Sequence, residues 1–262
     1  RVFLTLHSFH PSLKTALKSF KKCERVFLHS SSDLKILSGW GLKNGKLVLH
    51  GLNHFRDLPA AELREKLDFA RTSSPVLATH GMIHDKKGFP ELIQACKLLK
   101  EEFPDILLLM ATAVNPNNST SAGVYEQMRE LVIQEHLERN VLIIKDYLSY
   151  PEINKLLQIS DFIILPYGDV NEGTSGAVKT CMAASRPVMI TASHIFEDLP
   201  LGYRISDNAP ETLANGVKAL LHDPEKLAQL TSEVKTYTRE HLWERVALDY
   251  LLFLSKAEKP VL

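Results

Sequence analysis

Short apolar runs of strand length alternate with helix-compatible segments along almost the whole chain. In the first fifty residues these runs are VFLTLH, RVFLHS and KLVLHG. A second series begins near residue 75 and consists of PVLATHG, DILLLMATA, NVLIIKDYL, DFIILPY and PVMITAS. Apolar runs that alternate with helices are typical of parallel sheets, because helices cover both faces of such sheets. The pattern therefore predicts an α/β protein.

The two series of runs predict two Rossmann-like domains with a cleft between them, the first domain being incomplete. We expect residues 1–56 to form the last part of the first domain, 57–240 to form the second, and 241–262 to form a terminal helix. The mainly polar stretch 51–75 is interpreted as a connection. Because the chain starts at Arg1, directly in a strand-like run, we expect it to be part of a longer protein.

Composition limits the classes of partner. Lys plus Arg and Asp plus Glu are each 31, so charge gives no reason to expect nucleic acid or an anionic membrane as a partner. No apolar stretch approaches the roughly 18 residues of a membrane-spanning helix. The three cysteines Cys23, Cys96 and Cys181 are far apart in sequence, which favours reduced thiols over disulfides or a metal site. These features predict a cytoplasmic protein without a transmembrane segment.

A polar loop containing glycine lies between a strand-like run and a helix of small residues, in the segment DFIILPYGDVNEGTSGAVKTCMAASRPV. Ligands of open α/β sheets bind after the carboxyl ends of strands, and the N–H groups at a helix start attract anions. Ser175 and Gly176 are therefore candidates for phosphate binding, although Ser175 could simply cap the helix. Lys179 lies four residues after Ser175, on nearly the same face, and could bind the same anion or be a solvated surface lysine.

Four stretches, in this order, resemble the donor-binding domain of the glycosyltransferase group 1 proteins (family 4), which have the GT-B fold. They are THGMIHDKKGFPELIQACKLL, DYLSYPEINKLLQISDFIILPY, NEGTSGAVKTCMAASRPVMIT and HLWERVALDYLLFL. The first 55 residues resemble the end of that family's acceptor domain, and the last helix resembles its crossover helix. The resemblance implies a GT-B-like fold and a retaining hexosyltransferase whose substrate is a UDP- or GDP-sugar. Its acceptor would be a glycan, a lipid-linked group or a protein.

The resemblance also assigns roles to residues. His7 and Glu172 would contact the reacting sugar and are the catalytic candidates. Lys87, at a helix start that we expect to be exposed, would neutralise the diphosphate, whereas Lys86 would not. We expect His50 and His80, which end strands, to be structural. The candidate donor-binding residues are Gly81, Lys87, Tyr147, Gly173, Thr174, Ser175, Gly176, Lys179 and Thr180.

No Asp-x-Asp sequence and no metal-ligand spacing occurs, so we expect neither a metal nor another cofactor. Two positions depart from the family pattern. Met82 stands where the family commonly has an arginine, and Thr180 stands where it has a second glutamate. Lys179 could supply the cation missing at Met82, or it could be a solvated surface lysine.

Proteins with other functions have the same two-domain architecture. A sugar-nucleotide epimerase is one alternative, and a glycan phosphorylase would need a pyridoxal-phosphate lysine that we cannot locate. A non-catalytic sugar-nucleotide or glycan-binding domain is a further alternative, favoured by the absence of the family's arginine and glutamate. If the chain lacks part of the acceptor domain, we expect it to be weakly active or inactive by itself.

Overall fold

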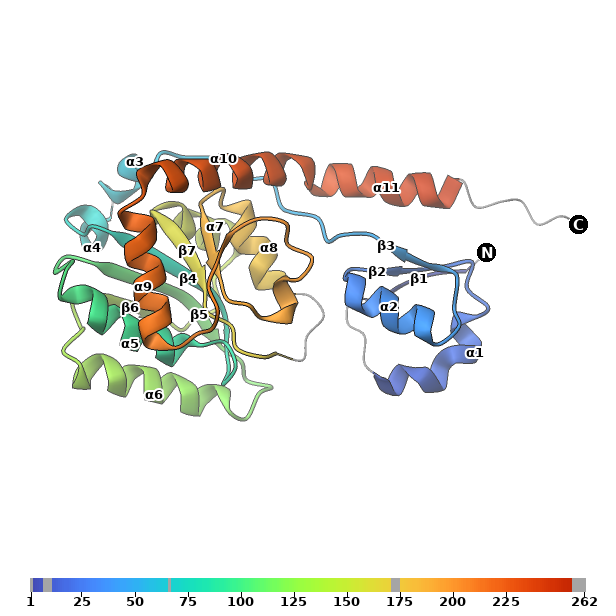
Figure 1. The fold of residues 1–262 in the computed structure, drawn as a ribbon, viewed down its shortest axis with the longest axis horizontal. Coiled ribbons are helices and arrows are strands. Elements are labelled where there is room, and N and C mark those ends of the chain that lie inside the picture. The colour runs from blue at the N-terminus through green and yellow to red at the C-terminus, as the bar shows by residue number, and fades with distance from the viewer. Residues whose placement is uncertain (1, 7–10, 66, 171–174, 256–262) are drawn as a thin grey trace, which may run out of the picture. The chain divides into compact units, whose positions relative to one another are not determined.

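The computed structural model describes residues 2–6, 11–65, 67–170 and 175–255 (Figure 1). By its internal contacts the chain divides into two compact units. Unit 1 comprises Arg1–His54, Asn171–Ser175 and Arg239–Leu262, and unit 2 comprises Phe55–Val170 and Gly176–Thr238. Both units contain parallel strands joined by helices, which confirms the predicted α/β class.

Unit 1 contains a three-stranded parallel sheet in the order β1-β2-β3. Ser30 caps helix α2, because its side chain accepts a hydrogen bond from the backbone N–H of Asp33 at 3.1 Å. Between β1 and β2 lie the 3-10 helix η1 and the short helix α1. The elements before unit 2 are β1 (Phe3–Leu6), η1 (Pro11–Ala16), α1 (Leu17–Phe20), β2 (Arg25–Leu28), α2 (Ser31–Gly39) and β3 (Gly45–Leu47).

The central strand β2 supplies side chains to both faces of this sheet, because successive strand residues point in opposite directions. Val26 and Leu28 pack with residues of α1 and α2 in one cluster. Phe27 packs on the other face with Val246 of α11 (Trp243–Ser255). The ring of Tyr250, also in α11, lies edge-on to Phe27 with 4.8 Å between centroids. The last helix therefore completes the core of unit 1.

Unit 2 contains a six-stranded parallel sheet in the order β6-β5-β4-β7-β8-β9. The short strand β9 was not predicted, and the stretch expected to be a connection contains helices α3 and α4. The strands are β4 (Val76–Ile83), β5 (Leu107–Val114), β6 (Val141–Ile144), β7 (Phe162–Leu165), β8 (Val188–Ile190) and β9 (Tyr203–Arg204). The helices are α3 (Ala60–Arg64), α4 (Asp68–Arg71), α5 (Phe89–Lys100), α6 (Ser121–Gln134), α7 (Tyr150–Gln158), α8 (Gly176–Ala183), η2 (His194–Phe196), α9 (Pro210–Leu221) and α10 (Pro224–Glu240).

Helices cover both faces of this sheet (Figure 1). Leu77 and Ile83 of β4 share a core cluster with Phe89 of α5, Met128 of α6 and Leu213 of α9. Helices α7 and α8 pack against β4 from the other face. The chain runs from β4 outward to β5 and β6 and then returns to β7 on the other side of β4. The strand order therefore reverses at β4.

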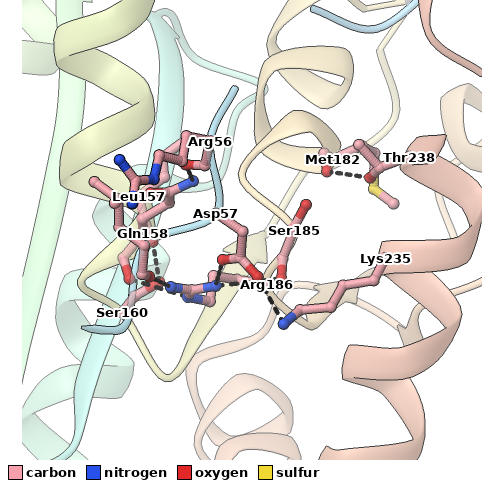
Figure 2. A network of polar contacts seen from close by, with 11 residues as sticks. Arg56, Asp57, Leu157, Gln158, Ser160, Met182, Ser185, Arg186, Lys235 and Thr238 are labelled. Carbon is pink, nitrogen blue, oxygen red and sulfur yellow. Dashed lines mark hydrogen bonds and ion pairs between the residues drawn. The ribbon is translucent and has the colours of Figure 1, made fainter. Parts of the chain in front are cut away.

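Arg186 binds the segment by which the chain enters unit 2 (Figure 2). Its guanidinium donates to Asp57 Oδ1 at 2.8 Å, to the Leu58 carbonyl at 2.6 Å and to the Gln158 carbonyl at 3.0 Å. Lys235 Nζ lies 2.7 Å from Asp57 Oδ2. Burial raises the pKa of Asp57, but the hydrogen bonds and charges of Lys235 and Arg186 outweigh this and hold the pKa below its usual value. The network fixes the entering segment to α7, to α10 and to the loop between α8 and β8.

Within the described residues, no helix combines the length and the hydropathy that crossing a membrane requires.

Candidate functional site

A pocket of about 400 Å³ opens at the carboxyl ends of β4 and β5 in unit 2. Its position agrees with the rule that open parallel sheets bind ligands where the strand order reverses. Its volume falls within the roughly 300–1,000 Å³ of typical ligand pockets. The pocket is lined by His80, Gly81, Met82, Ala111, Thr112, Ala113, Asp146, Tyr147, Leu148, Ser149, Tyr150, Pro151, Ile153, Gly176, Ala177 and Thr180. Four of the predicted donor-binding residues, Gly81, Tyr147, Gly176 and Thr180, are therefore brought together here.

Exposed apolar side chains line part of this pocket. Tyr147 is 79% exposed, Tyr150 is 56% exposed and Met82 is 41% exposed. An exposed aromatic ring beside a pocket offers a flat face on which a planar base can stack. Among the described lining residues there is no lysine or arginine. The pocket thus offers aromatic and apolar surface for a planar group, with Asp146 as an acidic lining residue.

Two threonines of the pocket donate hydrogen bonds to the backbone. Thr180 Oγ1 donates to the Gly176 carbonyl at 3.1 Å, one helical turn before it. Thr112 Oγ1 donates to the Ile144 carbonyl at 2.9 Å, which joins β5 to the end of β6. Each hydroxyl oxygen retains lone pairs that can accept a hydrogen bond.

His80 lies within β4 and not at its end, two residues before Met82 and hence on the same face of the strand. Its ring is half-buried, and Nδ1 lies 2.7 Å from the Ala111 carbonyl oxygen. Burial lowers the pKa of His80, although the hydrogen bond to Ala111 partly offsets this. Sequence reasoning missed His80 as a pocket residue. The two-residue spacing from Met82 was the signal that could have found it.

Gly81 lies where three elements meet. Its φ of +149° is one that residues with a side chain rarely adopt. A Cβ atom built on it would lie 3.4 Å from the hydroxyl of Tyr167 and 3.5 Å from the Cβ atom of Ala177. Gly81 therefore brings β4 close to the start of α8 and to the loop after β7.

Lys87 is 4% exposed, which corrects the expectation of an exposed lysine. Its Nζ lies 3.9 Å from the centroid of the Tyr167 ring. The next residue, Gly88, has φ +68°, and a Cβ atom there would lie only 1.9 Å from the carbonyl oxygen of Pro166. The loops after β4 and β7 thus pack directly on each other, and this packing buries Lys87. Lys86 stays exposed.

The start of α8 adjoins the pocket. Gly176 and Ala177 begin this helix and both line the pocket. Ser175 immediately precedes them and is 7% exposed. The N-terminus of a helix carries roughly half a positive charge, so this edge of the pocket favours an anion.

Lys179 is half-buried and is not among the described residues that line the pocket. Burial lowers the pKa of Lys179, and the negative charge of Asp198 partly offsets that effect. The structure therefore places its charge close enough to Asp198 to interact. Its role as a substitute for the cation missing at Met82 stays a prediction.

The predicted residues His7, Glu172, Gly173 and Thr174 lie outside the described residues, so their roles also stay predictions. Within the described ranges, no group of three or more His, Cys, Asp or Glu side chains is arranged to hold a metal ion.

Comparison with known proteins identifies the family. The sequence profile of the glycosyl transferases group 1 matches residues 61–237, more than half of the 262 residues. The chain therefore belongs to this family, as the four stretches of resemblance implied. A search of curated proteins found no match.

Solved structures confirm the GT-B-like fold. A glycosyltransferase from Rickettsia africae is 18% identical with a TM-score of 0.78, over 98% of this chain and 71% of that one. Sucrose-phosphate synthase from Thermosynechococcus elongatus is 18% identical with a TM-score of 0.78, over 97% and 67%. Anabaena HepE, solved in complex with UDP, is 16% identical with a TM-score of 0.79, over 97% and 72%. At these identities the likeness shows the fold alone.

Proposed function

We propose that this chain binds a nucleotide diphosphate sugar, a UDP- or GDP-sugar, and takes part in transferring its hexose to an acceptor. The observation that carries the proposal is the pocket at the carboxyl ends of β4 and β5, which adjoins the start of α8. The nucleoside would fill the pocket against Tyr147 and Tyr150. The diphosphate would lie at the start of α8, against the backbone of residues 173–176. The UDP in the HepE structure supports this class of ligand.

The chemistry requires positive charge at the leaving group. When the bond between the anomeric carbon and the diphosphate oxygen breaks, positive charge grows on the sugar and negative charge grows on the diphosphate. The start of α8 and Lys87 would stabilise that negative charge. Lys87 adjoins this region because Tyr167, on which its Nζ packs, also approaches Gly81.

Retention would follow if the acceptor hydroxyl attacks the same face that the diphosphate leaves. A new bond then forms between the anomeric carbon and the acceptor oxygen, and the hydroxyl proton passes to a diphosphate oxygen. Such a step uses neither a metal nor a protein base. We assign sugar contacts to His7 and Glu172. The acceptor would be a glycan, a lipid-linked group or a protein.

One observation favours a second candidate function, a non-catalytic sugar-nucleotide-binding domain. The family's arginine is replaced by Met82, which presents an exposed apolar side chain to the pocket. The hydroxyl at the family's second glutamate position, that of Thr180, donates to the backbone of its own helix. Both replacements remove charged groups from the donor site.

Calorimetry with UDP, GDP and ADP, with and without EDTA, tests the binding part of the proposal. We expect one of the three to bind with an affinity that EDTA does not change. Absence of binding by all three would overturn both candidate functions.

Phosphorus NMR of the chain with the matching nucleotide sugar separates the two candidates. The catalytic proposal predicts slow release of the nucleoside diphosphate to water, at a rate that Lys87→Met reduces. A rate equal to that of the nucleotide sugar alone would favour the non-catalytic domain.

A further inference from the structure

Three polar side chains of the pocket, those of Thr112, Thr180 and His80, bond to backbone carbonyl oxygens. Thr112 and Thr180 donate to carbonyl oxygens at 2.9 and 3.1 Å. A carbonyl oxygen can only accept, so Nδ1 of His80, at 2.7 Å from the Ala111 oxygen, must carry a proton. Asp146, which also lines the pocket, is an acceptor when ionised. These groups can therefore accept hydrogen bonds from a ligand.

Among these acceptors, His80 has the most firmly fixed orientation. A hydroxyl can rotate and give its proton to a ligand, but the imidazole of His80 is held by the bond to Ala111. Turning the ring over would move Nδ1 away from the Ala111 oxygen and break that bond. Burial lowers the pKa of His80, which favours the neutral ring. In a neutral ring with its proton on Nδ1, Nε2 has only a lone pair.

We propose that His80 determines specificity for the nucleoside part of the donor, because its Nε2 accepts a hydrogen bond from an O–H of the ribose or an N–H of the base. This inference rests on the proposed function, since it assumes that a nucleotide occupies the pocket. The pocket would reject a ligand that presents an acceptor at this position, because two lone pairs would then face each other. His80 would thus require a hydrogen-bond donor on the ligand. The family's arginine and glutamate are replaced nearby, at Met82 and Thr180.

Two substitutions separate ligand recognition from a structural role. In His80→Asn the amide nitrogen can replace Nδ1 and keep the bond to the Ala111 oxygen, while the acceptor at the position of Nε2 is lost. In His80→Gln the amide can reach the position of Nε2 and accept from a ligand, but it does not replace Nδ1. A role in recognition predicts that His80→Asn binds the nucleotide more weakly than His80→Gln. A structural role predicts the reverse order.

The experiment is calorimetry with whichever of UDP, GDP and ADP binds the wild-type chain most tightly. We expect His80→Asn to weaken binding about 3- to 10-fold, the usual effect of one lost hydrogen bond. His222→Phe is the matched control, because His222 lies at the end of α9, paired with Glu102 at 3.0 Å, and is not a pocket residue. Thermal unfolding of each variant shows whether its fold is retained.

Analogues of the same nucleotide identify the group that His80 recognises. The 2′-deoxy and 3′-deoxy forms each lack one ribose hydroxyl, and an N-methylated base lacks one N–H. We expect one of these analogues to bind wild-type protein more weakly than the unmodified nucleotide does. The affinity of that analogue should be the same for His80→Asn as for the wild type. An equal effect of His80→Asn on every analogue, or no effect on any ligand, would overturn the inference while leaving nucleotide binding established. Absence of nucleotide binding by the wild type would overturn the proposed function itself.

Discussion

Replacing Lys87 by methionine removes one positive charge and keeps an unbranched side chain of similar length. Lys87 is 4% exposed and its Nζ lies over the ring of Tyr167. If its ammonium binds the diphosphate, the substitution removes a charge-assisted hydrogen bond, which contributes about 1.5–3 kcal/mol. Because each 1.4 kcal/mol is a factor of ten, we expect Lys87→Met to weaken binding about 10- to 150-fold.

The same substitution should change stability less than affinity. A desolvated cation–π contact such as that between Lys87 and Tyr167 contributes about 2 kcal/mol. Burying the ammonium costs a comparable amount, and the buried methionine avoids this cost. We therefore expect the free energy of unfolding to change by less than about 2 kcal/mol. Alanine is a poorer choice because it would also remove the packing of the aliphatic stem on Tyr167.

Calorimetry with the nucleoside diphosphate that binds the wild type provides the assay, and urea denaturation reports stability. Lys86→Met is the matched control, since Lys86 is the preceding residue of the same loop and is exposed. We expect Lys86→Met to change affinity less than twofold, as surface charges usually contribute little. Equal affinities of Lys87→Met and Lys86→Met, with both proteins folded, would show that Lys87 is a structural residue.

Three further predictions concern single residues. Gly88→Ala should lower the free energy of unfolding by more than about 3 kcal/mol, measured with urea, because the Cβ atom would meet the Pro166 carbonyl at 1.9 Å; a smaller loss would mean that the loop can shift. Lys179→Met should weaken nucleotide binding about tenfold if Lys179 shares the diphosphate, and unchanged affinity would leave it only its interaction with Asp198. Because the pKa of Asp57 is held below its usual value, its ionisation stabilises the fold above that usual value, about 3.9, and this contribution is lost as the pH falls through the lowered folded pKa. In Asp57→Asn the free energy of unfolding should therefore fall less steeply than in the wild type as the pH is lowered on the acid side. A pH dependence equal to that of the wild type would contradict this.

The main elements of unit 2 could be predicted because each buries a run or a face of mainly apolar residues. β4, β5 and β7 correspond to such runs, and α5 buries its apolar face as the sequence pattern requires. The short elements could not be predicted, because contacts distant in sequence stabilise them. Helix α3 ends at Arg64, whose guanidinium lies 2.9 Å from Asp161 Oδ1. Strand β9 consists of two residues, Tyr203 and Arg204, which pair with Met189 and Ile190 of β8.

The candidate site was predicted only where a residue's place follows from the order of the elements. Gly81 lies near the carboxyl end of β4, Tyr147 follows β6 and Gly176 begins α8, and the structure places all three in the pocket. The burial of Lys87 could not be predicted, because it depends on how two loops separated by about eighty residues pack at Gly88. The orientation of His80 could not be predicted either, because it depends on a hydrogen bond to the neighbouring strand.

The burial of Lys87 and its position relative to α8 explain how a donor site could function without the family's arginine at the position of Met82. Among the described lining residues the pocket has no lysine or arginine, so it contributes little to binding the diphosphate through side-chain charge. Gly81 approaches both Ala177 at the start of α8 and the hydroxyl of Tyr167, and the Nζ of the buried Lys87 packs on the Tyr167 ring. Positive charge in a buried setting is more effective than the same charge in water, because less solvent screens it. A single buried lysine together with a helix N-terminus can therefore provide the stabilisation of the leaving group that an exposed arginine would otherwise share. In the proposed function the pocket, which His80, Thr112, Asp146 and Thr180 line with hydrogen-bond acceptors, is then left to recognise the nucleoside.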